Sequence, residues 1–313
     1  FQLSFQLLGI PPAVGINAFR PGQIDTILRY HIVGGQRVLS DTIAKRKPNI
    51  QLPTLFQLAP PSASLPPGLR LSVFPSSAVG NSLWVNNIPI TAAAVSASNG
   101  LIYKTGLALV PPSEMLWDRI AKDPNLTYLK AAIMRADEGS TPATSLQAAL
   151  QNPAANLTVF APTDAAFRQI LTLQITAALV QQGVPPATAL AQATALASTP
   201  AVFTNPALAS VLTPTNVKGV VVYHLFGFRD FSVNIPTTAT AYPTLLNTAV
   251  ASHPGVTIQS TFGATGVTAA TVKGVANQTA SNILINPSLG TGTSDQHYVN
   301  GVLHFIDQVL LPQ

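Results

Sequence analysis

The sequence predicts an α+β fold made of two related units in tandem, chiefly because two short blocks recur in the same order. A Tyr-His pair occurs at Tyr30-His31 and again at Tyr223-His224, and an Asn-Gly pair occurs at Asn99-Gly100 and again at Asn300-Gly301. The interval from His to Asn is 68 positions in the first unit (99 − 31) and 76 in the second (300 − 224). In both units a Pro follows the Asn after 12 positions (111 − 99 and 312 − 300). This agreement indicates one unit used twice.

The elements inside each unit follow from local patterns. Apolar residues fall at helical spacing just before each Tyr-His pair, so a helix is predicted to lead into each His. Short β-rich segments separated by Gly, Pro and Asn then run to the Asn-Gly pair, which favours a hairpin turn before a closing strand. Helices followed by a mostly antiparallel sheet are typical of the α+β class.

The second unit carries further predicted elements before its Tyr-His pair. Ser113 is the predicted N-cap of the first helix, and Thr163 or Asp164 is predicted to accept the free N–H groups of the helix that follows the strand. The patterns predict helices around 115–120, 126–134, 146–150 and 165–171, and a β-branched, alternating strand at 157–161.

Composition narrows the classes of protein that fit. The 313 residues allow about two domains. Only 9% are charged, against about 25% in an ordinary globular chain. The net charge of +5 comes from 16 scattered cations and 11 anions, with one run at 45–47, so no nucleic-acid partner is expected. There is no cysteine, which excludes disulfides and thiolate sites. No apolar run reaches the roughly 18 residues that span a bilayer.

The residues that could carry chemistry are better explained by structural roles. Asp164, His224 and His304 lie near several Ser and Thr residues, but no Gly-x-Ser-x-Gly elbow accompanies them. The first unit has Tyr103 where the second has His304, so no common catalytic set is kept. The segment 295–297 is at best a weak metal site and is expected to be an exposed polar loop. We therefore expect no catalytic residue, no metal and no cofactor.

Three segments of the second unit point to a known family. They are Thr-Val-Phe-Ala-Pro-Thr-Asp-Ala-Ala-Phe at 158–167, Val-Tyr-His at 222–224 and Tyr-Val-Asn-Gly-Val-Leu-His-Phe-Ile-Asp at 298–307. Together they closely resemble, in order and separation, the signature segments of the fasciclin (FAS1) domain. The resemblance implies two FAS1-like domains, each a mostly antiparallel β-sheet wedge with flanking helices: an N-terminally incomplete one at 1–112 and a complete one at 113–313.

The first unit departs from the family pattern in two ways. It lacks the opening segment, because Phe1 aligns with Phe167, and about 50 or more further residues are expected upstream from what precedes Phe167. It also has Tyr103 and Gly106 in place of His304 and Asp307. The second unit is longer between Phe167 and its Tyr-His pair, which predicts an inserted helical segment at about 172–200. That segment is either a decoration packed on its own domain or a partner-binding surface.

The resemblance implies a secreted or cell-surface, non-enzymatic adhesion or matrix protein. Its expected partner is a protein or glycan at the cell surface or in the matrix. Membrane attachment is expected only through an N-terminal anchor outside this chain, and the composition favours an exported bacterial protein. In animal members the Tyr-His region is linked to integrin contact. The structural or adhesion residues carried over are Thr163, Asp164, Tyr30, His31, Tyr223, His224, Asn300, Gly301 and His304.

Two other functions stay open at this stage. A glycan-binding accessory module of a bacterial surface polysaccharide system would show exposed aromatic side chains around one concave patch. The sequence instead favours a core position for Trp84, in a predicted Leu83–Val85 strand. A hydrolase would need an open pocket that holds His224 or His304 beside a nucleophile.

Overall fold

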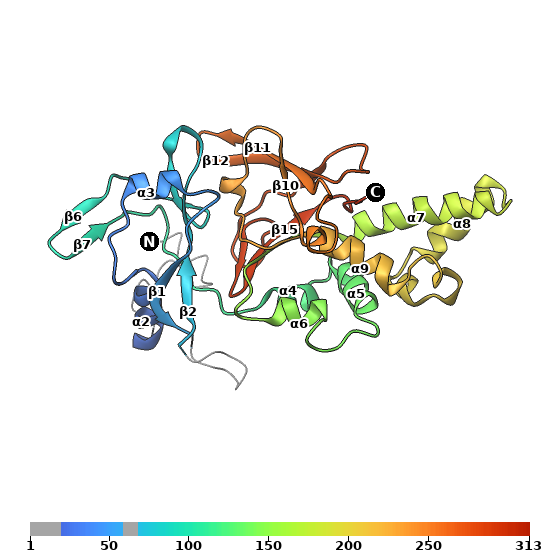
Figure 1. Ribbon diagram of the computed structural model, residues 1–313, viewed down its shortest axis with the longest axis horizontal. Helices are drawn as coiled ribbons and strands as arrows, with labels where there is room; N and C mark the ends of the chain where they lie inside the picture. The colour runs from blue at the N-terminus through green and yellow to red at the C-terminus, as the bar shows by residue number, and fades with distance from the viewer. Residues whose placement is uncertain (1–19, 59–67) are drawn as a thin grey trace.

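The computed structural model describes residues 20–58 and 68–313, and these residues form a mixed α+β structure (Figure 1). The matching of Phe1 with Phe167 lies outside the described residues. We refer to the described residues up to 112 as the N-terminal part and to residues 113–313 as the C-terminal part. In Figure 1 the C-terminal part fills the centre and right of the molecule.

One curled sheet organises the C-terminal part. Its strands run in the order β10-β11-β12-β13-β15-β8-β9, and β14 pairs with β15. Within the described residues every strand pairing is antiparallel except that of β8 with β15. The strands are β8 (Leu157–Pro162), β9 (Leu225–Phe226), β10 (Thr240–Tyr242), β11 (Val256–Gly263), β12 (Gly266–Lys273), β13 (Ser281–Ile283), β14 (Gln296–Tyr298) and β15 (Gly301–Ile306).

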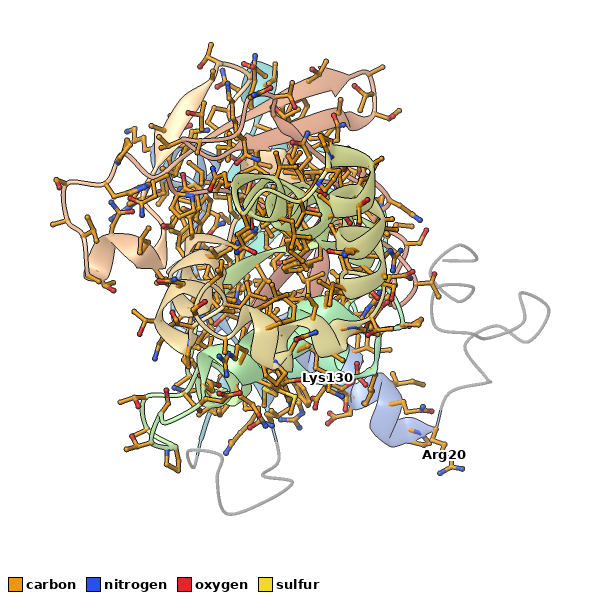
Figure 2. All side chains as sticks on the ribbon, turned by 90° about the vertical axis from the view of Figure 1, so that its right-hand side faces the viewer. Arg20 and Lys130 are labelled. Atoms are coloured by element: carbon orange, nitrogen blue, oxygen red, sulfur yellow. The ribbon has the colours of Figure 1, made fainter. Side chains whose placement is uncertain are left out.

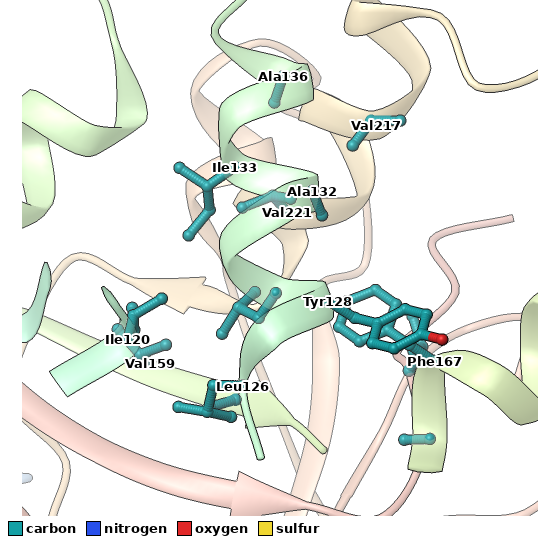
Figure 3. Packing of buried hydrophobic residues seen from close by; sticks show 14 of the residues in the cluster. Ile120, Leu126, Tyr128, Ala132, Ile133, Ala136, Val159, Phe167, Val217 and Val221 are labelled. Carbon is teal, nitrogen blue, oxygen red and sulfur yellow. The ribbon is translucent and has the colours of Figure 1, made fainter. Parts of the chain in front are cut away.

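Helices cover the β8–β15 region of this sheet and enclose the main core. Figure 3 shows apolar side chains of α5, α9 and β8 packed together, with the rings of Tyr128 and Phe167 stacked at 6.1 Å. Burial of this continuous apolar surface is the main stabilising term of the part. The helices are α4 (Leu116–Lys122), α5 (Thr127–Ala136), α6 (Leu146–Gln151), α7 (Asp164–Gln181), α8 (Pro186–Leu196) and α9 (Pro214–Tyr223).

The segment expected to be inserted near 172–200 is helical. It consists of the second half of α7 and of α8, which extend away from the sheet at the right of Figure 1 and face the viewer in Figure 2, above α5 with its labelled Lys130. Ala189 and Ala193 of α8 are fully buried, because small side chains let α8 approach α7 closely. The helical content is as expected, and the origin of the segment as an insertion stays a prediction.

The N-terminal part is smaller and has fewer helices. Its strands form short antiparallel sheets, and Tyr30 lies at the centre of its apolar cluster. Its elements are α2 (Pro21–Tyr30), α3 (Ser40–Lys45), β1 (Leu52–Gln57), β2 (Arg70–Val73), β3 (Pro75–Ser77), β4 (Leu83–Val85), β5 (Ile88–Pro89), β6 (Val95–Ala97) and β7 (Gly100–Ile102).

Several elements of the two parts correspond residue by residue. A shift of 193 positions relates α2 to α9 at both ends (214 − 21 and 223 − 30). A shift of 201 relates the β6–β7 hairpin to β14–β15 with the same register, since Val95↔Ile102 becomes Gln296↔Leu303. The bridge Ile90↔Thr105 becomes Ile283↔Ile306 under these two shifts (283 − 90 and 306 − 105).

The two parts also share apolar contacts. Phe74 and Trp84 of the N-terminal part cluster with Phe231, Val233 and Val302 of the C-terminal part. Trp84 is 7% exposed, in agreement with its expected core position. The predicted boundary between residues 112 and 113 stays a prediction, because this junction joins the parts through a common core.

Two local expectations are wrong in detail. The N-cap of α4 is Met115 and not Ser113, and the Asp118 carboxylate accepts the Met115 N–H at 2.8 Å. The helix expected at 165–171 runs on to Gln181, because no Gly or Pro interrupts the chain before Gly183.

The two Asn-Gly turns provide a matched test of this packing. A Cβ added to Gly301 would lie 2.5 Å from the Leu157 carbonyl oxygen and 2.5 Å from Leu116 Cδ1, whereas one added to Gly100 would meet nothing within 4 Å. We expect Gly301→Ala to lower the free energy of unfolding by about 1–3 kcal/mol, the usual cost of overpacking, and Gly100→Ala to change it little. Urea unfolding of both variants measures this, and equal losses would contradict the packing described.

Candidate functional site

The signature His of the C-terminal part links the end of a helix to the last segment of the chain. His224 is the C-cap of α9, and its Nδ1 donates to the Val220 carbonyl at 2.8 Å. Its Nε2 accepts the Leu310 N–H at 2.9 Å, which fixes the proton on Nδ1. Burial lowers the pKa of His224 from 6.5 to about 4, so the ring is neutral at physiological pH.

The N-terminal part contains the same arrangement. His31 caps α2, its Nδ1 donates to the Ile27 carbonyl at 2.7 Å, and its Nε2 accepts the Leu109 N–H at 2.9 Å. Ile27 and Val220 are related by the shift of 193, and Leu109 and Leu310 by the shift of 201. We call this arrangement the histidine clasp. The two clasps differ in environment, since His224 is 2% exposed and His31 is exposed.

The tyrosine before each His is buried and anchored to a strand. The Tyr30 hydroxyl donates to the Ser72 carbonyl at 3.1 Å, and the Tyr223 hydroxyl donates to the Gly255 carbonyl at 2.6 Å. Neither ring is accessible to solvent. Burial raises the pKa of Tyr30 to about 12 and raises that of Tyr223 as well. Both tyrosines therefore remain neutral donors inside the fold.

Asn300 joins three elements of the C-terminal part. Its Oδ1 accepts the Leu116 N–H at the start of α4 at 2.9 Å, and its Nδ2 donates to the Leu150 carbonyl in α6 at 2.8 Å. Its own carbonyl accepts the Leu157 N–H at the start of β8 at 3.1 Å. Asn300 is fully buried, whereas the corresponding Asn99 is exposed. The turn has a packing role only where helices cover it.

Thr163 and Asp164 cap two different helices. The Thr163 hydroxyl accepts the Ala166 N–H within the first turn of α7, as the sequence predicts. The Asp164 carboxylate instead accepts the Tyr128 N–H at 3.0 Å and the Thr127 hydroxyl at 2.5 Å, both at the start of α5. Asp164 is 9% exposed and ties α7 to α5, which sequence spacing alone does not reveal.

His304 belongs to a buried polar cluster at the junction of the two parts. Its Nε2 lies 2.9 Å from the Asp230 carbonyl oxygen, and its Nδ1 accepts the Asp295 N–H at 3.3 Å. The Asp295 carboxylate accepts from Ser232, from its N–H at 2.6 Å and from its hydroxyl at 2.8 Å. The segment 295–297 is therefore not the expected exposed loop, since Asp295 is 6% exposed and β14 begins at Gln296.

Arg229 lies at the centre of this junction and is 5% exposed. Its guanidinium donates to the carbonyls of Tyr298 and Val299 and to the His297 ring, and it stacks 4.6 Å from the centre of the Phe74 ring. Burial lowers the pKa of Arg229 to about 10, which still leaves it charged near pH 7. Burial and the Arg229 charge hold the pKa of His297 well below its ordinary 6.5.

Asp230 is the unusual member of the cluster. It is 1% exposed, and neither carboxylate oxygen has a hydrogen-bond partner among the described residues. Burial, with a smaller effect of the Asp295 charge, raises the pKa of Asp230 from 3.8 to about 8. The sequence analysis missed Arg229 and Asp230. The adjacent opposite charges in an apolar run from Val220 to Val233 were the available signal, because charges in such a run need a local reason.

The geometry leaves little room for catalysis at the signature residues. Both ring nitrogens of His224 and of His304 contact backbone groups, and the two side chains are 2% and 0% exposed. Neither can act as a general base for a nucleophile without breaking these bonds, so the hydrolase hypothesis that depended on them fails. Within residues 20–58 and 68–313 no group of three or more His, Asp or Glu is placed to hold a metal ion.

Replacement of the buried clasp is expected to cost more stability than replacement of the exposed one. His224→Ala leaves the Leu310 N–H and the Val220 carbonyl unpaired inside the protein, and we expect a loss of about 1–3 kcal/mol in the free energy of unfolding. His31→Ala frees similar groups near solvent, where water replaces the ring, so its loss should be smaller. Urea unfolding of the two variants compares them, and equal losses would show that burial is not what gives the clasp its strength.

Asp230 should make stability fall as pH rises from about 4 to about 8. The folded protein keeps a proton on Asp230 in this window that the unfolded chain releases, so folding is favoured at the acidic end. Asp230→Asn removes this titration, and its stability relative to the parent should rise by at most about 4 kcal/mol between pH 5 and pH 8.

His224 acts in the opposite direction between about pH 4 and 6.5, but it is present in both proteins and cancels in this difference. Urea unfolding across the range measures the difference, with Asp25→Asn at an exposed position as the control. A difference that is constant with pH would mean that Asp230 is ionised in the fold.

Comparisons with known proteins give one relevant likeness. No family model matches the chain, and no curated protein matches it. Among solved structures, the FAS1 domain pair of the insect cell adhesion molecule fasciclin I is similar over 93% of this chain and 80% of that chain, with 15% sequence identity and a TM-score of 0.37.

Proposed function

We propose that the protein is a non-enzymatic adhesion or matrix-interaction protein of the fasciclin type that acts outside the cell or at its surface. The observation that carries this proposal is the fate of the signature side chains. Tyr30, Tyr223, His224, Asn300 and His304 are all buried, and each makes hydrogen bonds to backbone groups. Side chains used in this way maintain a scaffold, and recognition is then left to the outer surface.

The scarcity of charge indicates how such a surface would bind. With 9% charged residues, long-range attraction contributes little, and contacts depend on apolar and neutral polar groups. The exposed large apolar side chains of the described residues include Leu28, Leu39 and Val95 in the N-terminal part. Their aliphatic character fits a protein partner. Within the same residues no aromatic side chain is exposed, and Trp84 and Trp117 are 7% and 8% exposed, so the glycan-binding alternative lacks a sugar platform.

The regions that the structure describes contain no helix with both the length and the apolar character needed to cross a bilayer. Export is part of the proposal and has its own test. Protease treatment of intact source cells should degrade the protein if it lies at the surface, with a cytosolic enzyme as the protected control.

An attachment assay tests the proposal. Surfaces coated with the folded protein should retain cells or matrix proteins above the level of albumin-coated surfaces, and coating with heat-unfolded protein should abolish the difference. Because few charges take part, retention should change less than about twofold between about 0.1 M and about 1 M salt. Folded protein that retains nothing, or retention that disappears in salt, would contradict this function or its apolar basis.

A further inference from the structure

A groove of about 850 Å³ opens between two segments of the N-terminal part. One wall is the chain that leaves α2, from His31 to Val38, and the other is β7 with the turn before it, from Asn99 to Tyr103. Its floor is formed by apolar core side chains such as Leu52 and Val85. The groove therefore adjoins the first histidine clasp and the first Asn-Gly turn.

The C-terminal part shows what the same two walls hold there. By the shifts of 193 and 201, Ile32 corresponds to Leu225 in β9 and Ile102 corresponds to Leu303 in β15. Strand β8 lies between β9 and β15, and its Val159 pairs with both Leu225 and Leu303. Among the described residues of the N-terminal part, β7 pairs only with β6, and no strand lies between it and Ile32.

The difference in burial marks the missing contact. Leu225 and Leu303 are 3% and 0% exposed, whereas Ile32 and Ile102 are 47% and 56% exposed. An apolar side chain that its counterpart buries, left half in water on both sides of one groove, forms an unpartnered apolar face. The backbone edges of the two walls are also available for pairing, as the edges of any unpaired strand are.

We propose that this groove takes an extended, uncharged, apolar β-strand supplied by a partner polypeptide. The strand would run parallel to β7 and antiparallel to residues 32–34, as β8 does between β15 and β9. Backbone hydrogen bonds to the two edges would supply affinity, and alternate side chains would fill the groove. The segment that occupies the corresponding place, Leu157–Pro162, has no charged residue, and we take it as the chemical pattern of the occupant.

A second copy of this chain is a poorer occupant. Its own β8 is buried at every position and pairs on both edges, so donating it would require the C-terminal part to unfold. Ion binding does not fit either, because Arg37 is the one Asp, Glu, Lys or Arg in the lining, and its guanidinium donates to the carbonyls of Ala97 and Ser98. The groove is suited to an uncharged strand.

A synthetic peptide tests the proposal directly. A fluorescently labelled peptide with the sequence of residues 156–164 should bind the intact protein in a saturable way at one site, measured by fluorescence polarisation. In β8 the Phe160 N–H donates to the His224 carbonyl at 3.0 Å, and the His31 carbonyl is the corresponding acceptor in the groove. A control peptide with Phe160→Pro lacks this N–H and should bind at least about tenfold more weakly, as loss of one such bond predicts.

Variants of the protein locate the site. Ile32→Lys and Ile102→Lys place a charge on each wall at exposed positions, so both proteins should fold, and each should weaken peptide binding by about tenfold or more. Leu173→Lys is the matched control, because Leu173 is 65% exposed on α7 in the other part of the molecule. Hydrogen exchange should show peptide-dependent protection of amides in 32–36 and 100–105.

The outcomes separate the possible occupants. Absent binding, equal binding of the two peptides, or binding that ignores Ile32→Lys and Ile102→Lys would overturn the proposal. A dimer that forms without peptide and that Ile102→Lys dissociates would assign the groove to a second copy and would overturn the partner strand. None of these results depends on the adhesion assay, which tests the outer surface of the folded protein as a whole.

Discussion

The fold depends on a neutral imidazole that connects the end of a helix to a strand far along the chain. A helix leaves its last carbonyls without partners, and an amide beyond the last strand also needs an acceptor. The clasp meets both needs with one ring, across 78 positions at His31 and 86 positions at His224. The neutral ring supplies a donor and an acceptor in rigid opposite directions, so it fixes where the helix ends relative to the closing segment, and the sheet between them is held in place.

The two clasps show which part of this arrangement is local and which depends on the surroundings. The bonds have nearly the same lengths in both parts, although His31 is exposed and His224 is buried. The clasp geometry is therefore set by the helix and the closing segment alone. Burial is added by β8 and by helices α4–α7 of the C-terminal part, and this addition gives the buried clasp its depressed pKa and makes Asn300 a fully bonded residue.

Local sequence patterns could predict the elements that depend on neighbouring residues. The helix before each Tyr-His pair, the strand at 157–161 and the Asn-Gly turns were all predicted, because spacing and turn chemistry act over a few positions. Long-range partners could not be predicted in this way. Asp164 caps α5, 36 positions before it, and Asp295 bonds Ser232 across 63 positions. The polarity of 295–297 suggested a loop, because its partners Ser232 and Arg229 come from a distant segment.

Arg229 and Asp230 follow one another in the sequence but do not neutralise each other. The Arg229 guanidinium is directed to carbonyls, the His297 ring and Phe74, while the Asp230 carboxyl is enclosed without a partner. A buried charge without a partner is costly, so Asp230 is kept as the neutral acid and its proton is part of the folded structure. Since this cluster contacts Phe74 of the N-terminal part, and Asn49 of that part donates to the Arg229 carbonyl, the cost falls at the junction. The union of the two parts is therefore the region of the molecule that depends most strongly on pH.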